Sequence, residues 1–529
     1  MESLATKQTT FDDGSEPSPT GANFTNSIRT FFAESVPWRA RVQTLALIVG
    51  LMCGVVACLY EAVMDYVNEK VWLQGGPAFA AFFPSLPQWS YILLTCTVLG
   101  GATGALIRLL GEPMANLPGV VLAAHKDGQL GYEEAPAMAV ISITNIAAGG
   151  SLGPEAPLVS IGGGLASFVS MYVDLSEAET LFVTMCGMGA GLAAFFGEPV
   201  GGALFACEVL HRHGLEYYEA VVPTVIAGLA CNWSFRVLAN LPQEPIWHFP
   251  EEPPLLPWIS VVGVLWGVIG GLLGWAWIKI TKLIRGKVMM PLGLGPKHIV
   301  KGFIGGLIIG SIGILFPETL FWAEFEAQTI ITLGKEPLRH VWPTTGVLGA
   351  YDLADPATGP YYLIAIGLAK LLAISITVLA GYRGGFIFPF MFAGHSLGMG
   401  FQILLAPYIF LSPASVALSM ACAINVAVTR TVIATPIVLA TLSGRTDCFP
   451  GLLVASIVSL HMTGEESIIV AARKRWLRTE LDGTEALTDR TPPMERNRPR
   501  LRSPGNTPSN SLHGGQLFNT LATAPKSLV

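Results

Sequence analysis

Residues 149–165 read GGSLGPEAPLVSIGGGL and place one ionisable residue, Glu155, in the middle of a very apolar chain. Pro154 and Pro157 interrupt any continuous helix, and Pro157 is well placed in the first turn of a new one. A carboxylate beside a broken helix inside a membrane is costly, and by default it marks an ion pathway. The alternative is a Gly/Pro surface loop with a solvated glutamate, and the rest of the chain decides between the two.

The composition is that of a polytopic membrane protein. The chain has 529 residues, of which 51% are hydrophobic and 13% charged, whereas soluble domains carry about 25% charged residues. The net charge of −6 comes without a large basic region, so we expect no nucleic acid partner. The eight cysteines are scattered without a CxxC pair, and we expect buried thiols, no metal site and no cofactor. No serine has the setting of a nucleophile, so we do not expect an enzyme.

The apolar runs predict an all-α fold, because only helices satisfy the backbone inside a bilayer without closing a barrel. Runs long enough for helices cover residues 42–67, 90–110, 217–241, 258–284, 299–316, 361–380, 387–405, 414–428, 432–442 and 449–461. Between residues 111 and 212 the apolar segments are short and interrupted, which indicates helices that end at mid-membrane around a site.

Four parts are expected along the chain. Residues 1–40 form a polar N-terminal arm and residues 479–529 a polar tail, and we expect both to be disordered. A Pro/Glu-rich connection over 242–257 separates a first membrane repeat, residues 41–245, from a second, residues 246–478. Basic residues flank the membrane part at both ends, which predicts that both termini are cytoplasmic. The polar start also argues against a cleavable signal peptide.

A pattern in the stretch 149–165 recurs 232 residues later in the chain. Both Gly153 to Pro157 and Gly385 to Pro389 read GxxxP, and the same offset relates apolar and glycine positions downstream as far as Leu210 and Leu442. The first turn of a helix leaves N–H groups unpaired and carries partial positive charge. Two helices that start at Pro157 and Pro389 and aim at one point would therefore bind an anion without a fixed cation. Glu155 beside them would act as a tethered competing anion.

At these residues the chain resembles the CLC family of chloride channels and chloride/proton exchangers, over roughly residues 39–475. Residues 153–157 resemble the family's GREGP signature, residues 385–389 its GxFxP signature, and residues 189–208 its helix pair after the gate. The resemblance implies a CLC-type fold of two inverted repeats with broken, tilted helices. It also implies that Glu155 is the gating glutamate. The anion-binding positions it implies are Ala115, Asn116, Gly153, Ala156, Pro157, Gly385, Phe386, Ile387 and Phe388.

Three departures from the family bear on the activity. Ala115 replaces the serine that contacts the central anion, with Asn116 beside it, and no tyrosine lies near residues 465–469. Val209 occupies the position of the internal proton glutamate. Its neighbour Glu208 is rotated by about 100° on a helix and is not a substitute. We therefore expect passive conduction of chloride or a similar small anion. A chloride/proton antiporter and a non-conducting membrane relative remain the alternatives.

The resemblance further implies a voltage-gated homodimer in the lipid bilayer with one pore per subunit. We expect its interface on the apolar faces of residues 199–238 and 414–442. The roughly fifty residues after Arg478 are too few for the family's nucleotide-binding (CBS) tail domains, so we expect none. The sequence leaves open whether chloride, nitrate or another anion is transported, and which membrane holds the protein.

Overall fold

The computed structural model describes residues 37–111, 120, 124, 129–173, 175–210, 214–250 and 258–464, and these form helices without any β-strand. Nine of the described helices are long and apolar enough to cross a membrane. Residues 112–119, which include Ala115 and Asn116, lie outside the described part, as do nearly all of the expected N-terminal arm and the whole tail. The position where a tyrosine was sought, residues 465–469, also lies outside it.

The first half runs in chain order as follows: α2 Trp38–Asn68, a π-helical continuation Glu69–Gln74, α3 Gly75–Phe82, α4 Ser90–Leu110, a 3₁₀ turn Tyr132–Glu134, α6 Ala135–Ala147, α7 Glu155–Ser170, α8 Glu177–Phe196, α9 Pro199–Leu210 and α10 Gly214–Ala239. The second half follows: α11 Ile259–Ile284, a π-helical continuation Arg285–Met289, α12 His298–Leu315, a 3₁₀ turn Pro317–Thr319, α13 Glu326–Ile331, α14 Gly359–Ala380, α15 Ile387–Leu405, α16 Pro413–Thr429, α17 Ala434–Leu442, a 3₁₀ turn Thr446–Cys448 and α18 Phe449–Thr463. The membrane runs predicted from the sequence therefore all form helices.

The two helices that were expected to start at Pro157 and Pro389 start two residues earlier, at Glu155 and Ile387. Each proline thus occupies the third helical position. Proline is tolerated there because its missing N–H would have no partner within the first turn. The correction matters because it puts Glu155 itself, and the N–H groups of Ile387 and Phe388, in the unpaired first turns.

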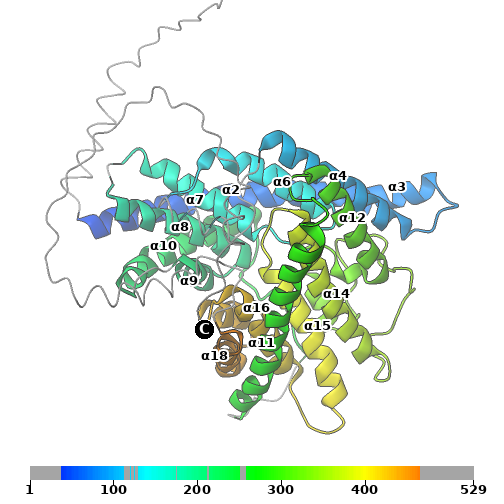
Figure 1. The fold of residues 1–529 in the computed structure, drawn as a ribbon. Coiled ribbons are helices and arrows are strands. Elements are labelled where there is room, and N and C mark those ends of the chain that lie inside the picture. Colours follow the sequence, from blue (N-terminus) through cyan, green and yellow to red (C-terminus); the bar gives the residue numbers. More distant parts are fainter. Residues whose placement is uncertain are drawn as a thin grey trace, which may run out of the picture.

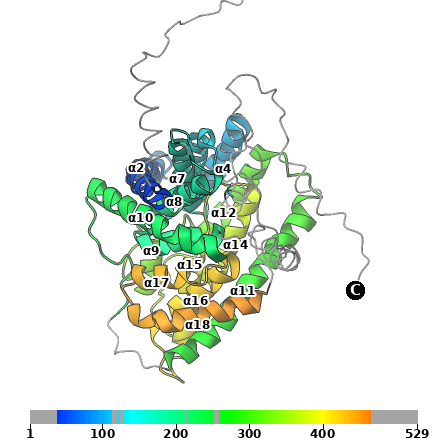
Figure 2. The same cartoon turned by 90° about the vertical axis from the view of Figure 1, so that its left-hand side faces the viewer.

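The order of the helices repeats. Helices α7 to α10 correspond to α15 to α18 at the offset of 232 residues that the sequence predicts. In both views the helices of the first half, blue to teal, lie above those at the end of the second half, yellow to orange (Figures 1 and 2). Helix α15 packs against α14 and α16, while α7 packs against α8. The two repeats also meet where α7 and α15 begin, since Gly153 and Gly385 form a bridge there.

Close packing depends on glycine at several of these contacts. A Cβ on Gly162 of α7 would lie 2.2 Å from the carbonyl oxygen of Gly187 on α8. A Cβ on Gly306 of α12 would lie 2.1 Å from the carbonyl oxygen of Cys96 on α4. Small residues at such crossings let helix backbones approach closely, which is how helices associate inside membranes.

Helix α16 corrects part of the expected dimer face. All its residues from Ala414 to Thr429 are buried within the protomer, so this segment cannot form a surface. An apolar run looks the same in sequence whether it faces lipid, a partner or the protein interior. The exposed apolar side chains in this region lie instead on α10, with Trp233 64% and Val237 60% exposed, and at Ile433.

Candidate functional site

Two glycines bring the helix starts together. Gly153 and Gly385 form an isolated antiparallel bridge, and each donates its N–H to the other's carbonyl oxygen at 2.8 Å. They are related by the 232-residue offset, so the bridge joins equivalent positions of the two repeats. The chain enters α7 immediately after Gly153 and α15 immediately after Gly385.

Glu155 is the first residue of α7 and is fully buried. Its carboxylate oxygen Oε1 accepts hydrogen bonds from the N–H groups of Ile387 and Phe388, each at 3.1 Å. These two N–H groups belong to the first turn of α15, where the helix carries partial positive charge. The side chain thus satisfies two donors that the first turn of α15 would otherwise leave unpaired.

The other carboxylate oxygen, Oε2, is buried and has no hydrogen-bond partner among the described residues. An unpartnered buried oxygen loses its hydration without compensation, which disfavours the charged form. The Glu155 side chain is therefore held on one oxygen only, an arrangement suited to a group that leaves its position.

The space for this side chain exists because its neighbours lack a Cβ. A Cβ on Gly153 would lie 2.3 Å from Glu155 Oε2, and one on Gly385 would lie 2.6 Å from both Glu155 Cβ and Oε2. Distances this short are not found between real atoms, so both positions require glycine while Glu155 points inward.

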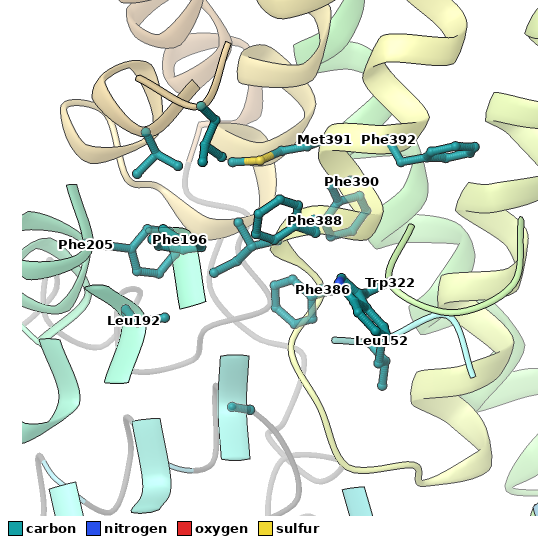
Figure 3. Close-up of a cluster of buried hydrophobic side chains, with 14 of the residues drawn as sticks. Leu152, Leu192, Phe196, Phe205, Trp322, Phe386, Phe388, Phe390, Met391 and Phe392 are labelled. Carbon is teal, nitrogen blue, oxygen red and sulfur yellow. The ribbon is translucent and has the colours of Figure 1, made fainter. Parts of the chain in front are cut away.

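Aromatic side chains surround the first turn of α15 (Figure 3). The ring of Phe388 packs at centroid distances of 4.9 Å from Phe195, 6.0 Å from Phe196 and 5.8 Å from Trp247. Such a wall excludes water, and electrostatic attraction between the helix N-terminus and an anion is stronger in a low-dielectric surrounding. The first turn of α15 therefore presents its unpaired N–H groups inside an apolar shell.

Polar side chains fix the backbone on both sides of the bridge. Asn425 of α16 donates its Nδ2–H to the carbonyl oxygen of Ile387 at 2.9 Å. Asn145 of α6 accepts from the N–H of Arg383 at 2.9 Å, and Thr377 of α14 accepts from the N–H of Ser151 at 3.1 Å. These three contacts hold the two loops that enter α7 and α15.

The predicted positions that the structure describes come together. Glu155 and the positions Gly153, Ala156, Pro157, Gly385, Phe386, Ile387 and Phe388 are all buried at the meeting point of α7 and α15. The N–H groups that reach the Glu155 carboxylate are those of Ile387 and Phe388. No side-chain cation makes a hydrogen bond with this carboxylate in the described part of the chain.

Val209 and Glu208, at the end of α9, have different surroundings. Val209 is 4% exposed and packs in the core. The Glu208 carboxylate accepts hydrogen bonds from the N–H groups of Ile433 at 2.9 Å and Ala434 at 3.1 Å. It therefore satisfies the unpaired donors at the start of α17 and stabilises that helix end.

Sequence reasoning missed four residues around the site: Asn425, Trp322, Glu324 and Lys370. Lys370 had a visible signal, since it is a single charge inside the apolar run 361–380, and such a residue faces the protein interior by default. It is fully buried and donates to the carbonyl oxygens of Thr319 at 2.9 Å and Phe321 at 2.7 Å. The other three carry no pattern that separates them from ordinary polar or aromatic residues.

Paired helix N-termini at the junction of two repeats are typical of multi-pass membrane transport proteins. Residues 99–464 match the family model described as voltage gated chloride channel. Since this match covers more than half of the chain, the chain belongs to that family, whose members transport anions across membranes.

Individual relatives are distant. The chain is 23% identical over 376 residues to the chloride/fluoride channel protein of Pseudomonas syringae pv. tomato, covering 70% of this chain and 74% of the relative. It is 24% identical over 373 residues to the chloride channel protein CLC-e of Arabidopsis thaliana, covering 67% of this chain and 48% of the relative. The chain thus spans about half the length of the Arabidopsis protein.

Solved structures share the fold. A slow cyanobacterial Cl⁻/H⁺ antiporter superposes with a TM-score of 0.67 at 17% identity, covering 84% of this chain and 99% of that one. A CLC-type fluoride/proton antiporter gives 0.61 at 19% identity, covering 81% and 97%. The prediction of a CLC-type fold is confirmed, and the identities are low enough that only the fold follows from these structures.

Proposed function

We propose that the protein is an anion channel in which the Glu155 side chain is the gate, with chloride or a similar small anion as the conducted ion. The observation that carries the proposal is the pair of 3.1 Å hydrogen bonds from Ile387 N–H and Phe388 N–H to the Glu155 carboxylate. A carboxylate on those donors excludes a free anion from them. Protonation removes its charge, weakens both bonds and leaves the donors to the anion.

The same geometry is compatible with chloride/proton or fluoride/proton exchange, and two of the similar folds are named as antiporters. The apolar Val209 argues for the channel, because a valine side chain has no group that binds a proton. Glu208, one residue earlier, has its carboxylate engaged by the start of α17. Proton coupling would therefore need a different inner acceptor.

Anion efflux from proteoliposomes tests the gate. Wild type is expected to release chloride faster at acidic than at alkaline pH, because Glu155 is then protonated. Glu155→Ala is expected to be at least as permeable and to lose the pH dependence. Glu133→Ala is the matched control, since Glu133 is an exposed carboxylate of the turn before α6, and it should behave as wild type.

Coupling is tested on the same vesicles. An inward chloride gradient that drives protons outward against their own gradient would establish the antiporter and overturn the channel. Vesicles that pass no anion with either wild type or Glu155→Ala would overturn both and leave the non-conducting relative. Replacing chloride by nitrate or fluoride then measures the selectivity.

We further propose a homodimer with one anion site per subunit and cytoplasmic termini, and voltage dependence that arises from the buried Glu155 charge. Within the chain we propose the first repeat over residues 41–245 and the second over 246–478, which the join near residue 245 and the repeated helix order support. Both repeats contribute to every site, so neither is expected to conduct alone.

A further inference from the structure

The segment Thr319 to Glu324, which we call the 319–324 loop, covers one side of the gate. The Cβ that Gly153 lacks would lie 2.3 Å from Glu155 Oε2 and 3.0 Å from Trp322 Cβ, so Oε2 and Trp322 lie on the same side of Gly153. Figure 3 shows Trp322 beside Leu152, on the opposite side of Phe386 and Phe388 from Phe196 and Phe205. The unpartnered oxygen of Glu155 is thus directed toward this loop.

Glu324 is the titratable side chain that the loop brings to the gate. Its carboxylate accepts a hydrogen bond from the indole N–H of Trp322 at 2.9 Å, and its backbone carbonyl accepts one from the indole of Trp247 at 2.8 Å. Burial raises the pKa of Glu324 to about 8; the Trp322 bond lowers it, and the negative charges of Glu61, Glu155 and Glu326 raise it. A carboxyl group of this kind takes up and releases protons near neutral pH.

Two acidic side chains of α2 are linked to Glu324 electrostatically: the charge of Glu61 acts on Glu324, and the charge of Asp65 acts on Glu61. Glu155 is fully buried, Glu324 is 8% exposed, Glu61 is half-buried and Asp65 is exposed. Glu61 and Asp65 lie one turn apart on α2. At about 1.5 Å per residue Asp65 is about 40 Å along α2 from Trp38, which exceeds the ~30 Å hydrocarbon core. Trp38 and Asp65 therefore cannot both lie within the hydrocarbon core, and we infer that the exposed Asp65 is at the membrane–water interface.

The other charged groups near Glu324 have partners of their own. The Glu326 carboxylate lies 3.2 Å from Nδ1 of His340. Lys370 of α14 donates to carbonyl oxygens of the 319–324 loop and lies over the ring of Phe392 at 5.2 Å. Both groups are thus engaged locally, whereas Glu324 is joined to the Glu155 side of Gly153 through Trp322.

We propose that Glu324 passes protons between Glu155 and the water at the Asp65 end of α2. The proton leaves the Glu324 carboxyl, directly or through a bridging water, and forms an O–H bond on Oε2 of Glu155. The Glu324 carboxylate then takes a replacement proton through Glu61 and Asp65, so charge and atoms balance. Neutral Glu155 releases the N–H groups of Ile387 and Phe388. This inference rests on the proposed function, since it names the proton donor of that gate.

Current recordings with rapid acidification on the Asp65 side test the relay. A step from about pH 7.5 to about pH 5.5 is expected to open wild type quickly, and Glu324→Gln to open about fivefold more slowly or slower, because general acid transfer is lost. The steady current at the acidic pH should stay within about twofold of wild type. Glu324→Asp keeps a carboxyl and should restore at least half the rate. Glu336→Gln, at a partly exposed carboxylate of the same connection, should open as wild type.

Two further variants keep the outcome decisive. Glu155→Gln should conduct without an acidification step. The double variant Glu155→Gln/Glu324→Gln should carry the same current as Glu155→Gln, which would also show that a chain with Glu324→Gln folds. If Glu324→Gln cannot be purified, Glu61→Gln is expected to slow opening as well. Opening at the wild-type rate in either variant would overturn the relay. A Glu155→Gln protein that passes no anion would instead overturn the proposed function.

Discussion

Gly385 lies so close to Glu155 that a methyl group there must displace the Glu155 side chain, which we propose as the gate. The missing Cβ would be 2.6 Å from both Cβ and Oε2 of Glu155. We expect Gly385→Ala to push the carboxylate off the N–H groups of Ile387 and Phe388, because helix starts cannot give way as a flexible side chain can. Chloride efflux at alkaline pH should then rise several-fold and its pH dependence should flatten, as measured in proteoliposomes.

Gly286→Ala is the control for this substitution, since nothing lies within 4 Å of its added Cβ. It should leave the efflux unchanged and the free energy of unfolding within about 0.5 kcal/mol. Efflux from Gly385→Ala that keeps the wild-type pH dependence would mean that Glu155 does not act from the position seen here.

Asn425 supports the donors of the site from behind. Its Nδ2 bonds to the carbonyl oxygen of Ile387, and its side chain is fully buried. Asn425→Leu removes this bond, so we expect the first turn of α15 to be held less well. The chloride concentration that gives half-maximal flux should rise about three- to tenfold, which corresponds to about 1 kcal/mol of binding free energy. The free energy of unfolding should fall by about 1–3 kcal/mol.

Ser459→Ala separates binding from stability. Ser459 of α18 donates from Oγ to the carbonyl oxygen of Ala423 at 2.6 Å, and Ala423 lies on α16, the helix that also carries Asn425. This variant should lose a comparable amount of unfolding free energy in detergent and keep the wild-type chloride concentration for half-maximal flux. If both variants need the same chloride concentration for half-maximal flux, Asn425 does not support chloride binding as we infer.

Helices α7 and α15 show which features of the elements could be predicted from the sequence. Two GxxxP stretches at a constant offset predict paired helix starts, and the Gly153–Gly385 bridge joins the equivalent residues. The starts themselves differ by two residues from the expectation, because a proline fits any of the first helical positions equally well. Local pattern thus predicts that the helices begin there, and the exact first turn follows from the tertiary contacts of Glu155.

The 319–324 loop could not be predicted, for a physical reason. Its backbone adopts the left-handed region at Phe321, φ 55°, and Ala323, φ 63°, where residues other than glycine are strained. No turn signal in the sequence announces this. The conformation is held by Lys370, which lies some fifty residues away in the chain and bonds to the carbonyl oxygens of Thr319 and Phe321.

Removal of the Lys370 ammonium should therefore release this loop. Lys370→Met fills a similar volume but leaves buried carbonyl oxygens without their charged donor, and we expect about 2–4 kcal/mol less unfolding free energy. Acid opening should also slow, because Trp322 and Glu324 lose their fixed place. Denaturant unfolding in detergent measures the first effect and current relaxation the second.

Lys335→Met is the matched control, since Lys335 is an exposed lysine of the same connection. It should change the free energy of unfolding by no more than about 0.5 kcal/mol and leave the rate of acid opening at the wild-type value. A Lys370→Met protein as stable as wild type would show that the left-handed residues of the loop are held by packing alone.

In the whole molecule, the repeat decides what is buried. Helices α15 and α16 are largely enclosed, and so are their counterparts α7 and α8 on the other side of the junction. The sequence predicted that both groups are apolar helices, yet it assigned α16 to a surface. Hydrophobicity alone does not distinguish lipid from protein as the neighbour of a helix, so only the packing of the two repeats reveals the free faces.

The free face of α10 carries the last prediction. Val222, Leu229, Trp233 and Val237 lie along one stripe of this helix, each more than half exposed. If lipid covers the stripe, truncation of Trp233 costs nothing in assembly. If a second subunit covers it, as we propose, Trp233→Ala removes a large aromatic contact of the kind that dominates interfaces, and the dimer should dissociate at about tenfold higher protein density or more.

Photobleaching steps counted in liposomes of decreasing protein density would measure this dissociation. Trp275→Ala on α11 is the control, because Trp275 is also exposed, by 40%, on a different helix. Chloride efflux per subunit should stay constant in both variants, since each site is built from the two repeats of one chain. If Trp233→Ala dissociates at the same protein density as wild type, the stripe faces lipid and the dimer interface lies on another face.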